Sequence, residues 1–217
     1  MARSNIYAFN STNKGAVTLK ELPSLAPEKQ TELKAEFVGL LGSVDRSGIK
    51  ELLGWLEQTD FYTAPASSQF HGNFDGGLLV HSISVYKYLK NFTKSLESNE
   101  DSLKVIGLLH DLCKVNFFTK QVRNVKVPGE KRWEEEESYA IDDHLPMGHG
   151  EKSVYLAMRF IQLTDEEALA IRWHMGGYDD AAHSYISGKA QSNAYRAYPV
   201  AAALNIADMY VTYILNQ

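Results

Sequence analysis

The sequence predicts an all-α fold with a small β-hairpin insertion, and three observations lead to this prediction. Apolar residues recur at helical spacing over most of the chain after residue 26. Three separate apolar stretches within that region are typical of buried helices. Between residues 116 and 140 the pattern changes to that of a β-hairpin. With 217 residues, 44% of them hydrophobic, and no repeat or linker, the chain is expected to form one globular unit.

The first part of the chain predicts an arm followed by two amphipathic helices. Residues 1–26 are polar and interrupted by glycine and proline, so we expect an arm with one short strand at residues 16–19. Pro27 suits the first turn of a helix, and Asp45 is the expected N-cap of the next one. Residues 27–217 are therefore predicted to be a single helical domain. The apolar residues at helical spacing in these two helices are Leu33, Phe37, Leu40, Leu41, Ile49, Leu52, Leu53 and Leu56.

Two buried helices are predicted in the middle of the chain. The first runs from about residue 77 to 96 and carries His81 on its apolar face. The second runs from about residue 102 to 114, with Asp101 or Ser102 as its N-cap, and holds His110 and Asp111. Two interpretations of this His-Asp pair are open from spacing alone. The histidine is either bonded to a core carbonyl or a metal ligand, and the aspartate either ends the helix or binds the same metal.

Residues 116–140 predict a hairpin inserted into the helical domain, with its turn at Pro128-Gly129. Its outgoing strand is basic and its returning strand is acidic. Charge pairing across the two strands explains this pattern better than an acidic docking tail does. The charged residues are Lys120, Arg123 and Lys126 on the first strand and Glu134, Glu135, Glu136 and Glu137 on the second.

After Gly148 the pattern is helical again. One helix leads to Ile161, and Thr164 is the expected N-cap of the next, which ends at Gly176-Gly177. Residues 178–197 are polar and aromatic, and we predict a loop there. The last helix, residues 198–215, holds Asp208 in an apolar stretch.

Composition limits the classes of partner and the cellular compartment. The net charge is −5 and the isoelectric point is near 5.8, so a general affinity for long nucleic acids is not expected. The only cysteine, Cys113, has no intrachain partner for a disulfide, which suits a reducing cytoplasm. The first residues lack the apolar run of a signal peptide, and no segment is long enough to span a bilayer. We therefore expect a cytoplasmic protein without a membrane partner.

Taken together, the motifs resemble the signature of the HD-domain metal-dependent phosphohydrolase superfamily. His81, His110-Asp111 and Asp208 follow its H…HD…D order, and residues 110–114 resemble its HD-x-x-K motif. The likeness covers about residues 65–215. Within the superfamily, residues 70–78 are most similar to the HD domain of bacterial 3′-to-5′ exoribonucleases, whose OB-fold has no counterpart in the short arm.

The resemblance implies a divalent metal centre of mixed nitrogen and oxygen ligands. Such a set suits Mn²⁺, Fe²⁺, Ni²⁺, Co²⁺ or Zn²⁺, and the absence of thiolate ligands disfavours a structural zinc site. Two further histidines match positions that bind a second metal in some branches, with Asp111 as the bridge. In the alternative, these two hydrogen-bond to substrate or water around one metal. The implied ligands are His81, His110, Asp111 and Asp208 for the first ion, and His149 and His174 for the second.

The same resemblance suggests which residues would hold a phosphorylated substrate. Lys114 is the expected phosphate contact and, with Asp111, the expected catalytic residue, although a salt bridge near the HD turn would also explain it. His71 is either a phosphate donor or an ordinary loop histidine. An aromatic loop residue could stack on a base or simply pack. The remaining candidate substrate contacts are Lys152, Arg172 and Tyr178, with Tyr185 as a further aromatic.

The function expected from the sequence is hydrolysis of a phosphate ester by metal-activated water. The implied substrate is a nucleotide or the end of a short oligonucleotide. One alternative keeps the same site but cleaves a deoxynucleoside triphosphate or a cyclic nucleotide. Another is a non-catalytic nucleotide-sensing or adaptor module that keeps the metal for stability. The oligomeric state stays open.

Overall fold

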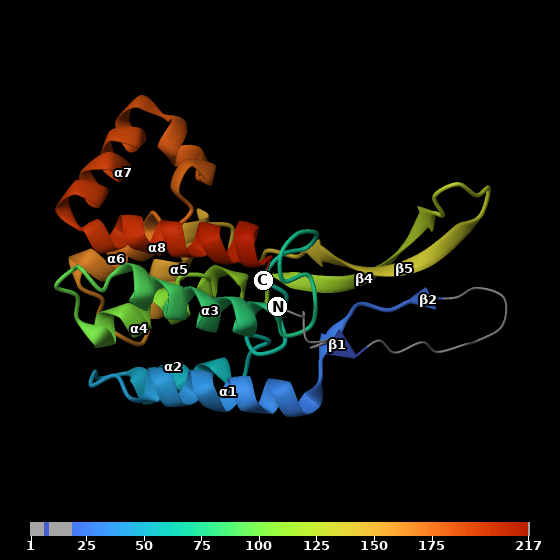
Figure 1. Cartoon of the computed structure of the whole chain (residues 1–217), viewed down its shortest axis with the longest axis horizontal. Coiled ribbons are helices and arrows are strands. Elements are labelled where there is room, and N and C mark those ends of the chain that lie inside the picture. The colour runs from blue at the N-terminus through green and yellow to red at the C-terminus, as the bar shows by residue number, and fades with distance from the viewer. Residues whose placement is uncertain (1–6, 9–18, 217) are drawn as a thin grey trace.

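The computed structural model describes residues 7–8 and 19–216, and for residues 7–8 and 185–188 it describes the backbone alone. A helical body carries a long ribbon of β-strands that projects from one end (Figure 1). The helices are α1 (Pro27–Gly42), α2 (Ile49–Leu56), α3 (Gly77–Phe92), α4 (Glu100–Leu109), α5 (His149–Met158), α6 (Asp165–Arg172), α7 (Tyr185–Ala197) and α8 (Pro199–Met209). The strands are β1 (Tyr7–Ala8), β2 (Leu19–Lys20), β3 (Ser24–Leu25), β4 (Phe118–Lys126) and β5 (Trp133–Ile141).

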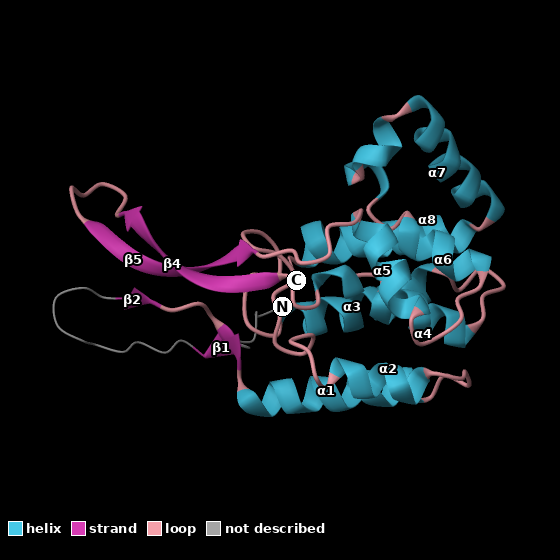
Figure 2. Ribbon diagram, turned by 180° about the vertical axis from the view of Figure 1, so that it is seen from behind, coloured by secondary structure: helices cyan, strands magenta, loops and turns pink. Residues whose placement is uncertain are grey.

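Helix α3 is the centre of the body. It contacts α1, α4 and α8, so its apolar side chains are covered from several sides. Seen from behind, α1 and α2 form one outer layer and α8 lies on the opposite side, with α7 above it (Figure 2). Helix α8 continues into a π-helical turn, Tyr210–Leu215, that also packs on α3. No helix in the described ranges is long and apolar enough to cross a bilayer.

The predicted hairpin is present, but the sheet is larger than a hairpin. Strands β4 and β5 pair antiparallel, and β2 adds to β5 in parallel to give the order β2-β5-β4. Lys20 Nζ lies 3.0 Å from Glu136 Oε1, so a charge pair helps to hold the added strand. Arg123 pairs with the same carboxyl group across the ribbon at 3.5 Å, as the charge pattern predicts. Of the strand predicted at residues 16–19, only Leu19 lies in the described part of the chain, and it belongs to β2.

The N-cap residues predicted from the sequence agree with the structure at one helix and differ at two. Thr164 forms a complete capping box with Glu167 at the start of α6, as predicted. The predicted caps of the earlier helices are wrong. Helix α2 begins after Gly48, whose φ of 89° favours glycine, and Asn99 caps α4 by accepting from the backbone N–H groups of Asp101 and Ser102.

The predicted loop at residues 178–197 is also wrong, because most of it is helical. A short 3₁₀ turn, Asp180–His183, leads into α7, which packs against α8. Ala194 is buried, while the other described side chains of α7 are exposed or partly exposed. A helix with so narrow a buried face lacks the strong apolar periodicity that the sequence would need to reveal it.

An ion pair between Arg46 and Glu167 is expected to stabilise the fold. The guanidinium donates to both carboxylate oxygens at 2.7 Å, and the Glu167 side chain is fully buried. Arg46→Met is therefore expected to lower the free energy of unfolding by about 2 kcal/mol, between the values typical of exposed and buried pairs. Urea unfolding at pH 7 measures this, and Lys29→Met, which removes the exposed pair with Glu32, is the control expected to change little.

The same pair predicts a dependence on pH. Burial would raise the pKa of Glu167, but the hydrogen bonds from Arg46 hold it below its ordinary value of 4.5. A carboxyl group with a lowered pKa stabilises the fold above that ordinary value and loses this contribution as the pH falls below it. The stability difference between wild type and Arg46→Met should therefore shrink between pH 7 and pH 3. A difference that stayed constant would contradict this role for the pair.

Candidate metal centre and substrate pocket

Two histidines from neighbouring helices meet in the core. His81 lies in the middle of α3 and His110 directly follows α4, and both side chains are fully buried. Their Nε2 atoms are 3.3 Å apart. His81 Nε2 also lies 3.1 Å from a carboxylate oxygen of Asp208, which is on α8. Three helices therefore bring the first predicted ligands to one point.

The hydrogen bonds of two histidines leave their Nε2 atoms ready to bind a cation. Nδ1 of His110 donates to the Gly107 carbonyl at 2.9 Å, and Nδ1 of His174 donates to the Ile171 carbonyl at 2.6 Å. In a neutral ring held this way, the lone pair is on Nε2. The Nε2 atom of His174 is buried without a hydrogen-bond partner in the described structure. An unsatisfied buried acceptor of this kind is what a metal ligand provides.

Asp111 lies between two pairs of histidines. Its Oδ2 atom is 3.5 Å from His81 Nε2 and 3.4 Å from His110 Nε2. Its Oδ1 atom is 2.9 Å from His149 Nε2 and 3.5 Å from His174 Nε2. Each carboxylate oxygen thus faces its own pair of imidazole nitrogens, which is the arrangement that a carboxylate bridging two cations needs.

The donor set fits a divalent transition metal. Ligand atoms lie within 4.8 Å of one another in three groups, which are His81, His110 and Asp208; His110, Asp111 and His174; and Asp111, Cys113 and His149. Imidazole and carboxylate donors suit the metals named above. All six predicted ligands are therefore brought together and could hold one or two ions.

A pocket of about 470 Å³ opens onto this cluster where the ribbon joins the helical body. Four charged or ionisable residues that belong to the cluster or contact it line the pocket, and we call them its floor: Asp111, Lys114, His149 and Asp208. The wall is largely apolar and comes from five separate segments. The wall residues are Ala66, Ser67, Ser68, Phe70, His71, Phe117, Phe118, Ile141, Met175, Tyr178, Asn205, Met209, Thr212 and Tyr213.

Comparison with known families decides the identity of the fold. The family model of the HD domain matches residues 78–212, which is more than half of the chain. The chain belongs to the HD-domain family. Searches of curated proteins and of solved structures gave no match. HD domains form a superfamily of metal-dependent phosphohydrolases that bind divalent metals, so the predicted enzyme class and the predicted cofactor are confirmed at this level. The likeness to exoribonucleases stays a prediction.

The cluster of predicted metal ligands, which we call the HD centre, contains two carboxylates, Asp111 and Asp208, and both are held ionised. Burial would raise the pKa of Asp111, but Lys114 and His110 lower it well below its usual range. Burial also opposes ionisation of Asp208, and a hydrogen bond from His81 lowers its pKa. Ionised carboxylates are the form that binds a metal.

The histidines of the HD centre have divergent pKa values. Burial disfavours a charged ring at His149, yet Cys113 and Asp111 together raise its pKa to about 10. Burial lowers the pKa of His174, which therefore stays neutral and retains its free Nε2 lone pair. The two histidines that face Asp111 Oδ1 are thus in different protonation states before a metal binds.

Lys114 and His71 lie at the pocket, as predicted. Nζ of Lys114 is 2.6 Å from Asp111 Oδ2, so the predicted salt bridge is present, and the same residue lines the pocket. The salt bridge is therefore observed, and the role of Lys114 as a phosphate contact stays a prediction. The ring of His71 is centred 5.1 Å from that of His81, and burial lowers the pKa of His71 to about 4. His71 is consequently neutral at pH 7.

The other candidate substrate contacts fall into two groups. Tyr178 lines the pocket, whereas the side chain of Tyr185 lies outside the described residues. Lys152 and Arg172 are not among the described residues that line the pocket. Lys152 is buried and pairs with Asp143, and Arg172 pairs with Glu151 and Asp179. Their roles in substrate binding stay predictions.

Sequence reasoning missed several residues of the site. Cys113 Sγ lies 3.3 Å from both ring nitrogens of His149, and only its position two residues after Asp111 hinted at this. Asn205 donates to the His174 carbonyl at 2.6 Å and so supports the backbone beside that ligand. Three residues before Asp208, it lies one helical turn from a predicted ligand, which is the available signal. The apolar wall residues carried no signal that separates them from core residues.

Proposed function

We propose that this chain hydrolyses a phosphate ester of a nucleotide, or of the end of a short oligonucleotide, with metal-activated water. The observation that supports this most is the buried cluster of imidazoles and carboxylates at the floor of a pocket with aromatic walls. In the reaction, water forms a new bond to phosphorus, the ester P–O bond breaks, and the leaving alcohol takes a proton. The products are the alcohol and inorganic phosphate, or a nucleotide when a diester is cut.

The proposal includes two metal ions bridged by Asp111. His81, His110 and Asp208 would hold one ion, and His149 and His174 the other, because each pair of histidines faces a different oxygen of Asp111. When bound, such ions lower the pKa of water and stabilise charge on the phosphoryl oxygens. The buried protein groups hold this geometry without rearrangement, since the Nδ1 atoms of His110 and His174 are fixed by backbone carbonyls.

Two further side chains are proposed to act on the substrate. Lys114 is already charged and held by Asp111, so its remaining N–H groups would bind a phosphoryl oxygen. His71 is neutral, so it would donate one hydrogen bond to phosphate or to the leaving oxygen without adding charge. The two residues lie on different segments at the same pocket, which would fix the phosphoryl group between them.

Metal content and hydrolysis test the proposal together. After reconstitution with Mn²⁺ or Fe²⁺, elemental analysis is expected to find about two ions per chain. His174→Ala should lose about one of them. His144→Ala is the matched control, because that histidine is highly exposed and pairs only with Asp142 among the described contacts. The loaded wild type should release phosphate or a nucleotide from a panel of phosphate esters.

Two results would contradict this function. Wild-type protein that binds no more metal than His174→Ala after reconstitution would remove the second ion from the mechanism. A loaded protein that binds nucleotides and never cleaves them would instead support the sensing or adaptor alternative, and removal of its metal would then be expected to unfold it.

A further inference from the structure

The pocket provides one place for a phosphoryl group. Lys114 is the only lysine or arginine among the described residues that line it, and it lies at the floor with the metal ligands. Nearby cations are engaged elsewhere, since Lys152 pairs with Asp143 and Arg172 pairs with two carboxylates. Additional phosphates of a triphosphate would therefore lie against apolar side chains without a charged partner.

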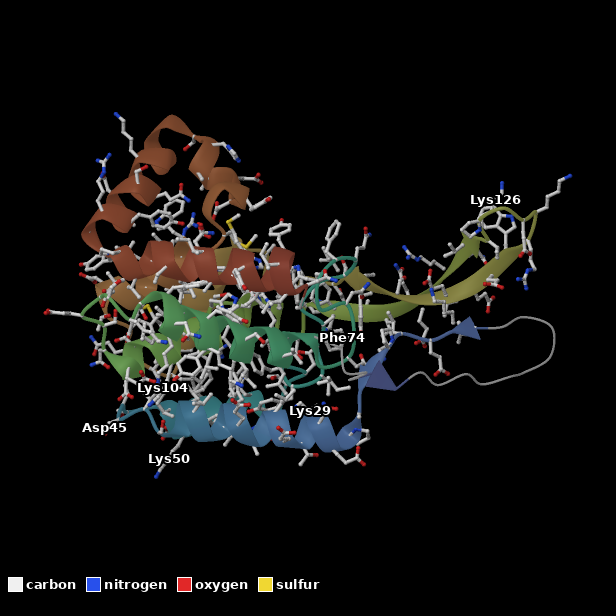
Figure 3. The ribbon with its side chains drawn as sticks, in the orientation of Figure 1. Lys29, Asp45, Lys50, Phe74, Lys104 and Lys126 are labelled. Atoms are coloured by element: carbon white, nitrogen blue, oxygen red, sulfur yellow. The ribbon has the colours of Figure 1, made fainter. Side chains whose placement is uncertain are left out.

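Several other lysines lie away from the pocket. Figure 3 shows Lys126 near the far end of the ribbon, and Lys50 and Lys104 at the end of the helical body away from the ribbon. The pocket lies where ribbon and body join, because Phe118 at the start of β4 and Ile141 at the end of β5 both line it. On β4, which begins at the pocket, Lys120 pairs with Asp75 and Arg123 pairs with Glu136, so these exposed cations already have carboxylate partners when a longer nucleic acid approaches.

Aromatic faces at the mouth of the pocket are open. The Phe70 side chain is 81% exposed, which is unusual for phenylalanine, and Tyr178 and Tyr213 are 61% and 59% exposed. The two tyrosine rings stack with centroids 6.0 Å apart and an angle of 25°. Stacking on such rings suits every base, because each base has an aromatic face.

Three polar side chains on the wall are engaged in hydrogen bonds within the protein. The Ser67 hydroxyl donates to the His71 carbonyl and accepts from the Phe70 N–H. Asn205 Nδ2 donates to the His174 carbonyl, and the Thr212 hydroxyl donates to Asp208. Discrimination between bases requires hydrogen bonds to base edges, and Ser67, Asn205 and Thr212 already use part of their hydrogen-bonding capacity within the protein.

We propose that the pocket selects the monophosphate ester of a single nucleoside, stacks the base between Phe70 and the tyrosines with little preference among bases, and rejects triphosphates. This proposal rests on the proposed function and deepens it. Water attacks the one phosphorus atom, the bond between phosphorus and the nucleoside oxygen breaks, that oxygen takes a proton from the attacking water, and the products are nucleoside and inorganic phosphate. The volume of about 470 Å³ falls within the range of pockets for one small ligand, about 300–1,000 Å³.

Substrate comparison on metal-loaded wild type gives the first test. The value of kcat/KM for nucleoside monophosphates should vary by less than about 10-fold among the four bases. It should exceed the value for ribose 5-phosphate, which lacks a base, by about 10- to 100-fold, as expected for one stacked base. It should exceed the value for the matching triphosphate by about 100-fold or more. Calorimetric affinities should follow the same order, so the test does not depend on turnover.

Two pairs of variants make the test specific. Phe70→Ala should lower the ratio of monophosphate to ribose 5-phosphate affinity about 10-fold, and Phe70→Trp should keep it. Ile141→Lys adds a cation at an exposed wall position and should raise the kcat/KM of the triphosphate relative to the monophosphate at least about 5-fold, whereas Ile141→Gln should not.

The outcomes separate this inference from the proposed function. If triphosphates or long oligonucleotides were cleaved as well as monophosphates, or if Phe70→Ala left the affinity ratio unchanged, the inference would be wrong while hydrolysis stood. If no phosphate ester were cleaved but monophosphates bound in the predicted order, the selectivity would stand and the hydrolytic function would fall.

Discussion

Asp111→Asn is expected to reduce kcat/KM for any substrate of this enzyme by about 1,000-fold or more, which corresponds to about 4 kcal/mol of transition-state stabilisation. The reason lies in the double role of this carboxylate. Oδ2 faces His81 and His110, while Oδ1 faces His149 and His174. An asparagine of the same size offers one oxygen and one NH₂ group, so it cannot accept from both sides.

The same substitution should remove most of the stabilisation that metal binding gives to the folded protein. Lys114 is almost fully buried and lies 2.6 Å from Asp111, so the variant also leaves a buried ammonium group without its partner. In wild type, adding Mn²⁺ should raise the Tm, because the metal binds the folded state. In Asp111→Asn that rise should be mostly lost.

Steady-state kinetics, elemental analysis and thermal unfolding with and without Mn²⁺ measure these effects. Asp142→Asn is the matched control, since its carboxyl group is exposed and pairs with His144 outside the cluster. Retention of both metal binding and activity in Asp111→Asn would refute the bridged centre. Loss of activity with both ions retained would instead assign Asp111 to substrate chemistry.

The sequence predicted the ligands better than the surroundings of the site. His81, His110 and Asp208 could be found because each is a polar residue in an apolar helical stretch, which is costly unless the residue has a partner or a function. The wall of the pocket could not be found this way. Phe70 and Ile141 come from segments far apart in the chain, and no local pattern separates a wall residue from a core residue.

The sequence predicts Arg172 as a substrate contact because it lies close to His174 in the chain, whereas it is not among the described residues that line the pocket. Arg172 is the last residue of α6, whereas His174 lies in the turn that follows the helix, so closeness in sequence does not place the two side chains on one side. Arg172 reaches Glu151 and Asp179 instead of the pocket floor. Strand β2 could not be predicted accurately from the sequence pattern. A strand as short as Leu19–Lys20 is defined by its pairing with β5 and not by its own residues.

Gly107→Ala is the second substitution expected to have a large effect, and it acts through the packing of two helices. A Cβ atom at this position would lie 2.7 Å from Tyr86 Cα and 2.9 Å from Tyr86 Cβ. Backbone cannot rotate away from such a contact, so α3 and α4 would have to separate by about 1 Å to restore ordinary contact distances. Overpacking of this kind costs about 1–3 kcal/mol of stability.

Gly107→Ala should impair metal binding and catalysis more than it lowers the free energy of unfolding. His110 follows Gly107 by three residues and bonds to its carbonyl, while His81 lies on the opposing helix, so the separation moves the first metal's ligands apart. A misplacement of about 1 Å can lower a rate about 100-fold. We expect kcat/KM to fall by about that factor and one ion to be bound more weakly.

Two other glycines give the comparison that isolates this mechanism. A Cβ atom at Gly150 would lie 2.2 Å from the Arg172 carbonyl oxygen, so Gly150→Ala should displace α5 from α6 and weaken the ion held by His149 and His174. At Gly39 a Cβ atom would meet nothing within 4 Å, so Gly39→Ala should stabilise α1 by up to about 1 kcal/mol and leave metal content unchanged. If Gly107→Ala and Gly150→Ala each lost about one ion and Gly39→Ala lost none, two separate helix contacts would be shown to position the two halves of the centre. If Gly107→Ala behaved like Gly39→Ala, close packing of α3 on α4 would have no part in holding the metal.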